Sequence, residues 1–312
     1  MKLALVFPGQ GSQSVGMLQS FSDSKPVRET FAEAADILDQ DLWQLTGDGT
    51  PEELNSTVNT QPLMLTAGYA VYRAWRDAGG LEPAMVAGHS LGEYTALVVA
   101  GVMSLRDALP LVRLRAQAMQ EAVPVGTGAM AAILGLDDDA VRAACAEAAQ
   151  GEVVEAVNFN APSQVVIAGH KAAVERAAAS AKAKGAKRAV MLPVSAPFHA
   201  SLLKPAAERL EKALAGINFN APRIPIVNNV DVAVVGDPQQ IKAALARQAC
   251  SPVRWVEVIQ HMARAGVTHV GECGPGKVLA GLTKRIEGGL QGFAIADAAS
   301  LTQSLQIFRE AA

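Results

Sequence analysis

The feature that most constrains the fold of this chain is the stretch "VAGHSLGEYTALVVAG", from Val86 to Gly101. The apolar residues at its start predict a buried strand, and the residues after the glycines predict a helix. Ser90 lies between Gly88 and Gly92 in the pattern G-x-S-x-G, which is typical of a nucleophilic serine on a sharp strand-to-helix turn. The pattern also occurs by chance in glycine-rich chains, but the strand and helix around it favour an acyl-accepting Ser90.

Strand and helix patterns alternate along most of the chain, which predicts a mostly parallel sheet flanked by helices. Between Gly126 and Pro193 the pattern changes to β-α-β-β-α-β, which is the ferredoxin-like order. We therefore expect an α/β fold whose mostly parallel sheet is formed by residues 1–125 and 194–312. Residues 126–193 are expected to form an inserted ferredoxin-like subdomain.

Several local details of the fold follow from single residues. Pro62 predicts the first turn of a helix over residues 61–78. Ser104 is suited to be the N-cap of the next helix, and Pro110 is expected to kink it. The stretch "RIPIVNN" (residues 223–229) is expected to be a short strand.

The composition argues against several classes of protein. The chain has 312 residues, a formal net charge of −3 and no long run of one charge, so we do not expect a nucleic-acid partner. No segment approaches the ~18 apolar residues of a membrane helix, and the apolar run Leu3 to Phe7 is too short for a signal peptide. The three cysteines lack metal-binding spacing, which favours reduced thiols in a cytoplasmic protein.

A serine nucleophile needs a base, and the chain has five histidines. His199, in the irregular segment "PVSAPFHASLLKP", is the candidate base, with an ordinary loop histidine as the alternative. His89 adjoins Ser90 on the turn and should point away from it. We expect His170 on the surface and structural roles for His261 and His269. Asp137, Asp138 and Asp139 are suited to capping a helix, so no acid of a hydrolase triad is found.

Two further stretches leave alternatives open. The glycines of "FPGQGSQ" (residues 7–13) let backbone amides approach a ligand, so the loop either supplies an oxyanion-hole donor or is a plain turn. Arg113 and Arg115 flank the apolar face of their helix on opposite sides. Either could bind a carboxylate, and helical periodicity does not choose between them.

Seven stretches occur in this order along the chain: "FPGQGSQ", "AGHSLGEY", "RLRAQAMQEAVP", "GTGAMAAILG", "SAPFHASLLKPA", "NNVD" and "SPVRW". Together they resemble one enzyme family, the bacterial malonyl-CoA:acyl-carrier-protein transacylases of fatty acid synthesis, and the acyltransferase domains of polyketide synthases are also similar. The resemblance spans roughly Leu3 to Lys284 and implies that residues 1–125 and 194–312 form an α/β-hydrolase-like catalytic domain. It also implies transfer of a malonyl group from malonyl-CoA to the phosphopantetheine thiol of an acyl carrier protein, by a ping-pong route through a malonyl-serine.

The resemblance also implies roles for individual residues. Ser90 in "GHSLG" would be the nucleophile, and His199 in "PFH" would be the general base. The family likeness implies a dyad without a carboxylate, in which a backbone carbonyl at Gln248 orients the histidine. The backbone amides of Gln10 and Leu91 would form the oxyanion hole.

Substrate selection is the last implication of the resemblance. Arg115, in "RLRAQAM", would bind the malonyl carboxylate, and the bulky Phe198 supports malonyl over methyl-branched malonyl. No metal or other cofactor is expected, and the protein is expected to be a cytoplasmic monomer. The alternatives are an acyltransferase of a polyketide pathway, the related subunit of a malonate decarboxylase, a general serine esterase, or a carrier-protein-binding module without catalysis.

Overall fold

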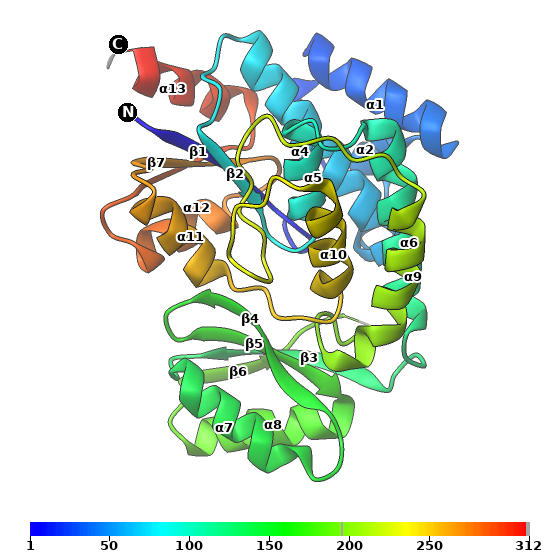
Figure 1. Cartoon of the computed structure of the whole chain (residues 1–312), viewed down its shortest axis with the longest axis vertical. Coiled ribbons are helices and arrows are strands. Elements are labelled where there is room, and N and C mark those ends of the chain that lie inside the picture. Colours follow the sequence, from blue (N-terminus) through cyan, green and yellow to red (C-terminus); the bar gives the residue numbers. More distant parts are fainter. Residues whose placement is uncertain (195, 310–312) are drawn as a thin grey trace.

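The computed structural model describes residues 1–194 and 196–309, which form two separate sheets with helices around them (Figure 1). The first sheet has the strand order β2-β1-β7-β8, and every neighbouring pair is parallel. Its strands are β1 (Leu3–Phe7), β2 (Met85–Gly88), β7 (His269–Cys273) and β8 (Gln291–Ile295). This sheet and the helices packed on it are called the parallel-sheet region below. The mostly parallel α/β sheet predicted from the sequence is confirmed.

Strand β1 is buried on both faces, as expected for a central parallel strand. Leu5 and Phe7 pack into the larger apolar cluster, beneath helices that include α4 and α6. Ala4 and Val6 face the opposite cluster, which α11 and α12 cover. The helices of this region are α1 (Lys25–Leu38), α2 (Leu42–Asp48), α3 (Pro51–Asn55), α4 (Thr57–Asp77), α5 (Gly92–Val99), α6 (Leu105–Glu121), α9 (Lys204–Ala215), α10 (Pro238–Gln248), α11 (Trp255–Arg264), α12 (Val278–Ile286) and α13 (Ala298–Arg309), with short 3-10 turns at Gln19–Phe21 and Ser201–Leu203.

The second sheet is antiparallel and lies at the other end of the molecule (Figure 1). Its strand order is β4-β5-β3-β6, and α7 and α8 pack together on one of its faces. The elements are β3 (Gly128–Leu134), α7 (Asp138–Ala149), β4 (Val154–Ala161), β5 (Gln164–His170), α8 (Lys171–Ala183) and β6 (Arg188–Met191). They follow one another in the ferredoxin-like order and are called the antiparallel-sheet region. The division of the chain into domains at residues 126 and 193 stays a prediction.

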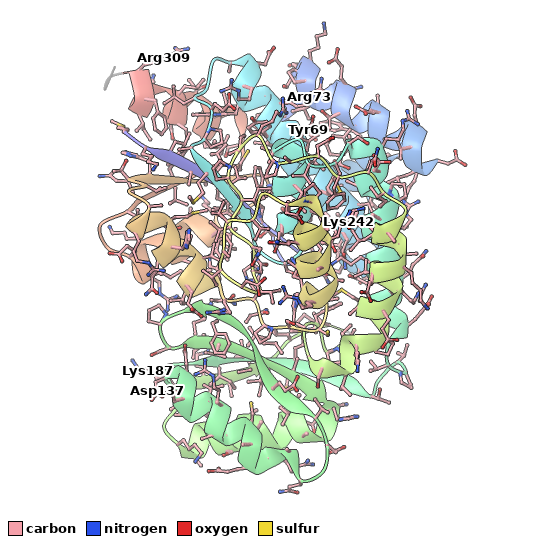
Figure 2. All side chains as sticks on the ribbon, in the orientation of Figure 1. Tyr69, Arg73, Asp137, Lys187, Lys242 and Arg309 are labelled. Carbon is pink, nitrogen blue, oxygen red and sulfur yellow. The ribbon has the colours of Figure 1, made fainter. Side chains whose placement is uncertain are left out.

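The acidic run "DDD" caps a helix, as expected. Asp137 lies in the antiparallel-sheet region, and its carboxylate accepts a hydrogen bond of 2.9 Å from the amide of Ala140 in the first turn of α7 (Figure 2). The cap at Ser104 is also confirmed, since its hydroxyl accepts from the amide of Asp107.

Two local predictions from the sequence are wrong, and the kink expected at Pro110 stays a prediction. Helix α4 begins at Thr57, so Pro62 lies inside the helix, within a segment whose side chains are almost all buried. Packing there outweighs the hydrogen bond that proline lacks. The stretch "RIPIVNN" forms no strand. It pairs with β2 through a single bridge between Ile226 and Val86, because Pro225 has no amide with which to extend the pairing. Helix α6 continues through Pro110, which lies within its bounds.

Candidate active site

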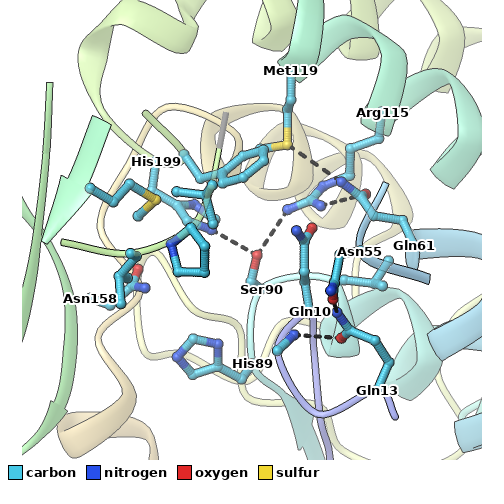
Figure 3. Close-up of a pocket in the computed structure, with 17 residues that line it drawn as sticks. Gln10, Gln13, Asn55, Gln61, His89, Ser90, Arg115, Met119, Asn158 and His199 are labelled. Carbon is cyan, nitrogen blue, oxygen red and sulfur yellow. Dashed lines mark hydrogen bonds between the residues drawn. The ribbon is translucent and has the colours of Figure 1, made fainter. Parts of the chain in front are cut away.

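Ser90 lies on the turn between β2 and α5, at the carboxyl end of the parallel sheet (Figure 3). Its φ of +53° is a left-handed backbone conformation that persists only where the surrounding structure holds it. A Cβ atom on Gly88 would lie 1.8 Å from the backbone carbon of Gly92, and one on Gly92 would lie 2.0 Å from the carbonyl oxygen of Phe7. The turn therefore requires glycine on both sides of the serine.

The structure brings His199 against Ser90, although 109 positions separate them in the chain. The His199 Nε2 atom lies 2.7 Å from the Ser90 Oγ atom. On the other side of the ring, Nδ1 lies 2.8 Å from the backbone carbonyl oxygen of Gln248. A carbonyl oxygen only accepts hydrogen bonds, so Nδ1 carries the proton and Nε2 is free to accept the hydroxyl proton of Ser90. The structure thus brings Ser90, His199 and the Gln248 carbonyl together, and their catalytic roles stay predictions.

The surroundings of His199 keep its ring neutral. The residue is only 3% exposed, and its burial, followed by the positive charge of Arg115, lowers its pKa to about 3. A neutral imidazole is the form that can take a proton from a hydroxyl. At neutral pH the histidine is therefore in the state that a general base requires.

The side chain of Arg115 reaches Ser90 from helix α6 and is only 2% exposed. Its Nη2 atom donates to the Ser90 Oγ atom at 3.1 Å and to the Gln248 Oε1 atom at 3.0 Å. Its Nη1 atom donates to the Gln61 Oε1 atom at 2.7 Å. All three acceptors are uncharged, and no ion pair within the described ranges includes Arg115. The guanidinium is thus a buried cation with room for an anionic partner.

Arg113, the alternative arginine, points elsewhere. It donates to the backbone carbonyl oxygen of Leu38 and to the side chain of Gln40. It therefore ties α6 to the end of α1 and does not enter the site. The structure thus places Arg115, and not Arg113, beside Ser90.

The loop after β1 lies directly against the Ser90 turn. A Cβ atom on Gly9 would lie 2.6 Å from the carbonyl oxygen of His89 and 3.7 Å from the amide nitrogen of Leu91. Leu91 is the N-cap of α5, and neither its amide nor that of Gln10 has a hydrogen-bond partner among the residues described. The side chain of Gln10 is held through its Oε1 atom by the Thr57 hydroxyl. Two free amides therefore border the cavity beside Ser90.

The cavity over Ser90 has a volume of about 450 Å³ and lies between the two sheet regions. Phe198 lines it, as do apolar residues from the antiparallel-sheet region such as Met130. The lining residues are Gln10, Gly11, Gln13, Asn55, Gln61, His89, Ser90, Leu91, Arg115, Met119, Met130, Asn158, Leu192, Pro193, Val194, Phe198 and His199. Every site residue predicted from the sequence lines this cavity except Gln248, which lies behind His199 and Arg115.

Three buried polar residues of the site were not identified from the sequence. Gln61 holds one end of the Arg115 guanidinium. The Asn229 Oδ1 atom accepts from the amide of Ser90 at 2.8 Å, and its Nδ2 atom donates to the carbonyl oxygen of Gly88 at 2.8 Å. The Glu93 carboxylate accepts from Gln248 and from the amide of Asn229. Glu93 lies within "GHSLGEY" and Asn229 within "NNVD", so only the position in a family motif could have pointed to them.

The other histidines take no part in the contact with Ser90. The His89 ring lies 2.8 Å from the Asn160 Oδ1 atom through Nε2, and His170 accepts from the amide of Val153. His261 lies in α11 and His269 begins β7. No cluster of His, Cys, Asp or Glu suited to a metal occurs in the described part of the chain, and none of its helices is long and apolar enough to cross a membrane.

An α/β fold with a serine on a strand-to-helix turn, bonded to a neutral histidine, defines the class of serine-based acyl-transfer enzymes. The chain belongs to the acyl transferase domain family, whose model matches residues 4–282. This confirms the family predicted from the sequence motifs.

Named relatives cover almost the whole chain. The malonyl CoA-acyl carrier protein transacylase of Escherichia coli (strain K12) is 57% identical over 307 residues, which are 98% of this chain and 99% of the relative. The crystal structure of the acyl-carrier-protein S-malonyltransferase from Burkholderia pseudomallei 1710b is 68% identical, with a TM-score of 0.97 over 98% of this chain and 100% of that one. A malonyl-transacylase solved in complex with its type II PKS acyl-carrier protein is 52% identical, with a TM-score of 0.97 over the same shares.

Proposed function

We propose that this protein transfers a malonyl group from malonyl-CoA to the phosphopantetheine thiol of an acyl carrier protein, through a malonyl ester on Ser90. The observation that carries the proposal is the buried Arg115, which lies 3.1 Å from the Ser90 Oγ atom and has only uncharged partners. A serine hydrolase needs no cation there, whereas a malonyl thioester brings a carboxylate to that place. The names of the full-length relatives support the same activity.

In the first half-reaction, His199 Nε2 takes the hydroxyl proton while Ser90 Oγ attacks the thioester carbonyl carbon. The amides of Gln10 and Leu91 donate to the oxyanion, and such donors contribute about 3 kcal/mol each. The carbon–sulfur bond then breaks, and the coenzyme A sulfur leaves with the proton held by His199. A malonyl ester remains on Ser90. Every proton and electron pair in these steps is held by the chain or by the thioester, so the steps require no cofactor.

In the second half-reaction, the carrier-protein thiol gives its proton to His199 and attacks the ester carbonyl carbon. The same amides stabilise the second oxyanion. The bond between the acyl carbon and Ser90 Oγ breaks, and the proton returns from His199 to the serine oxygen. The malonyl group leaves as a thioester, and the free enzyme is restored. His199 thus alternates between base and acid in both halves.

Arg115 selects the acyl group in this scheme. A malonyl carboxylate buried without a partner would be costly, and an acetyl group would leave the guanidinium without an anion. Both penalties favour malonyl over acetyl groups. Phe198 beside His199 limits the space at the reacting end, which supports unbranched malonyl.

A transfer assay tests the proposal against a serine esterase. The protein is mixed with malonyl-CoA and a phosphopantetheinylated carrier protein, and the carrier is analysed by mass spectrometry. We expect malonyl-carrier as the main product and slow turnover of simple aryl esters. Free malonate as the main product, or rapid aryl-ester hydrolysis that survives Arg115→Ala, would contradict the proposal.

A carrier protein of a polyketide pathway is a second candidate acceptor. The observation that favours it is the relative solved with its type II PKS carrier protein, which matches this chain along almost its whole length. Transfer rates to a fatty-acid carrier and to a polyketide carrier, measured side by side, separate the two. A faster rate to the polyketide carrier would move the reaction to that pathway.

The monomeric state, the cytoplasmic location and the two-domain division stay predictions of the sequence. Size-exclusion chromatography with light scattering checks the first. Limited proteolysis near residues 126 and 193 checks the third.

A further inference from the structure

Glu93 is a buried carboxylate that the proposed steps do not use. It is the second residue of α5, three positions after Ser90, and it is only 3% exposed. A buried charged group is retained only where hydrogen bonds or an opposite charge compensate for the loss of water. Its partners therefore show what the carboxylate stabilises.

Both partners of Glu93 hold the backbone of the serine turn. The Glu93 Oε2 atom accepts from the Asn229 amide at 3.0 Å and from the Gln248 Nε2 atom at 2.8 Å. Asn229 then accepts from the amide of Ser90 at 2.8 Å, while Gln248 Nε2 donates to the Ser90 carbonyl oxygen at 3.0 Å. The peptide groups on both sides of the strained serine are thus fixed by residues that Glu93 holds.

Gln248 also links Glu93 to His199 and Arg115. Its backbone carbonyl oxygen accepts from His199 Nδ1 at 2.8 Å, and its Oε1 atom accepts from Arg115 Nη2 at 3.0 Å. A rotation of the Gln248 side chain would release Arg115 and the Ser90 carbonyl together. The bond from Gln248 Nε2 to Glu93 opposes that rotation.

We propose that Glu93 is a positioning residue for the malonyl transfer, whose ionised carboxylate holds Gln248 and Asn229 and thereby keeps Ser90, His199 and Arg115 in one arrangement. This inference rests on the proposed function, because it concerns the rate and the selectivity of that same site. Glu93 touches no reacting atom and acts only through its two partners.

The charges around Glu93 favour a role that depends on its ionisation. Arg115 faces it from α6, Asp231 from the segment after Asn229, and Tyr94 from the same helix. Burial raises the pKa of Glu93 to about 7, against the hydrogen bonds from Gln248 and Asn229 that lower it. The pKa of His199 lies at about 3, far below this range. A change of rate near neutral pH therefore lies in the range of a buried glutamate such as Glu93 and far from the pKa of His199.

The matched control is Glu272, a second buried glutamate at the end of β7. It is fully buried, and burial raises its pKa to about 7 as well. Its Oε2 atom accepts from the amide of Ala280 in α12, and its Oε1 atom has no partner among the described residues, so Glu272 lies outside the network around Ser90. Glu93→Gln and Glu272→Gln thus remove the same kind of charge, and only the first removes it from the network around Ser90.

The experiment measures the single-turnover release of coenzyme A from malonyl-CoA between pH 5.5 and 9, and the preference for malonyl-CoA over acetyl-CoA. For the wild type and Glu272→Gln we expect the rate to fall about tenfold from pH 8 to pH 6, as for one group with a pKa of about 7. In Glu93→Gln we expect a rate at pH 8 that is lower by about tenfold or more, without this fall, and a weaker malonyl preference.

Several outcomes would overturn the inference. A uniform loss of rate in Glu93→Gln with the wild-type pH profile would show a merely structural role. A profile altered in Glu272→Gln would assign the titration to the wrong glutamate. If Glu93→Gln does not fold, the pH profile of the wild type still tests the inference, because a wild-type rate that stays constant from pH 8 to pH 6 contradicts it. A wild type that forms no malonyl-Ser90 would instead contradict the proposed function.

Discussion

The two sheet regions of this molecule contribute different things to the same cavity. The parallel-sheet region supplies Ser90 at the end of β2 and Arg115 from α6, with Gln248 of α10 behind Arg115. The antiparallel-sheet region supplies the opposite wall, with Met130 from β3 and Asn158 from β4. The strand ends of a parallel sheet face helix N-termini, which suits them to bind developing negative charge. An antiparallel sheet with helices on one face offers no such edge.

The second face of the antiparallel sheet explains why that region is nevertheless needed. On β5, Val165 and Ile167 pack against the helices, while Val166 and Ala168 face the other way. That other face forms a small cluster with Ala200, which directly follows His199. The antiparallel sheet thus supports the loop that carries His199, the proposed base, while Ser90 and Arg115 lie outside this sheet.

The largest difference in rate between variants of the two regions should come from replacing one histidine in each. His199→Ala removes the base and should lower the rate of malonyl loading by about 10⁴-fold. His170→Ala, in the antiparallel-sheet region, should leave the rate unchanged, because the His170 ring accepts from the local amide of Val153 and does not line the cavity. Stopped-flow measurement of coenzyme A release checks both. A slow His170→Ala would remove the distinction between the regions.

The next effect concerns the two arginines of α6. Arg115→Ala should lower kcat/KM for malonyl-CoA by about 10²- to 10³-fold and reduce the preference over acetyl-CoA, because a buried carboxylate loses its cation. Arg113→Ala is the matched control, since its side chain contacts Leu38 and Gln40 and does not reach the cavity. Steady-state kinetics with both thioesters checks the prediction. Equal losses in the two variants would contradict the role of Arg115.

A smaller effect should appear in the pH dependence of stability. The folded-state pKa of Glu272, raised by burial to about 7, exceeds its ordinary value of 4.5, so the folded state binds more protons between those values. Stability is therefore lost as the pH rises through this window. Glu272→Gln does not titrate, so between pH 5 and pH 8 it should gain roughly 2 kcal/mol relative to the wild type.

Urea unfolding at the two pH values measures this difference. Glu147→Gln, in the antiparallel-sheet region, is the control, because that carboxylate lies at the surface with Lys184 and its pKa is lowered. Its stability difference from the wild type should stay constant above pH 5. A Glu272→Gln difference that does not change with pH would argue against a protonated buried glutamate.

The smallest effect should come from the wall of the cavity. The Asn158 Oδ1 atom is buried and has no hydrogen-bond partner among the described residues, so it can accept from a donor of the substrate. Asn158→Ala should raise KM for malonyl-CoA by about threefold to tenfold and leave kcat unchanged, which corresponds to one neutral hydrogen bond. A large fall in kcat would show that the antiparallel-sheet region takes part in the chemical step, which would contradict the division of roles between the two regions.

Much of this arrangement could be predicted from the sequence. The G-x-S-x-G turn, the parallel strands and the β-α-β-β-α-β insertion each have a local pattern that the chain itself displays. The irregular segment around His199 indicates a candidate base, and the family resemblance supports its pairing with Ser90. The choice of Arg115 over Arg113 rests on the resemblance alone, since helical periodicity does not separate them.

The rest depends on contacts between distant segments. Glu93 and Asn229 lie 136 positions apart, and only the folded chain shows that the amide of one meets the carboxylate of the other. The prediction of a first helical turn at Pro62 was wrong, because packing inside α4 outweighs the preference of proline for a helix start. The prediction of a strand at residues 223–229 was wrong, because Pro225 limits the pairing of this segment with β2.

The formation of a malonyl ester on Ser90 can be tested by the intact mass of the protein after brief exposure to equal amounts of malonyl-CoA and acetyl-CoA. We expect one malonyl adduct, located on Ser90 by peptide mapping, little acetyl adduct, and no adduct in Ser90→Ala. Malonyl and acetyl adducts in equal amounts, or an adduct that persists in Ser90→Ala, would contradict selective malonyl transfer through Ser90.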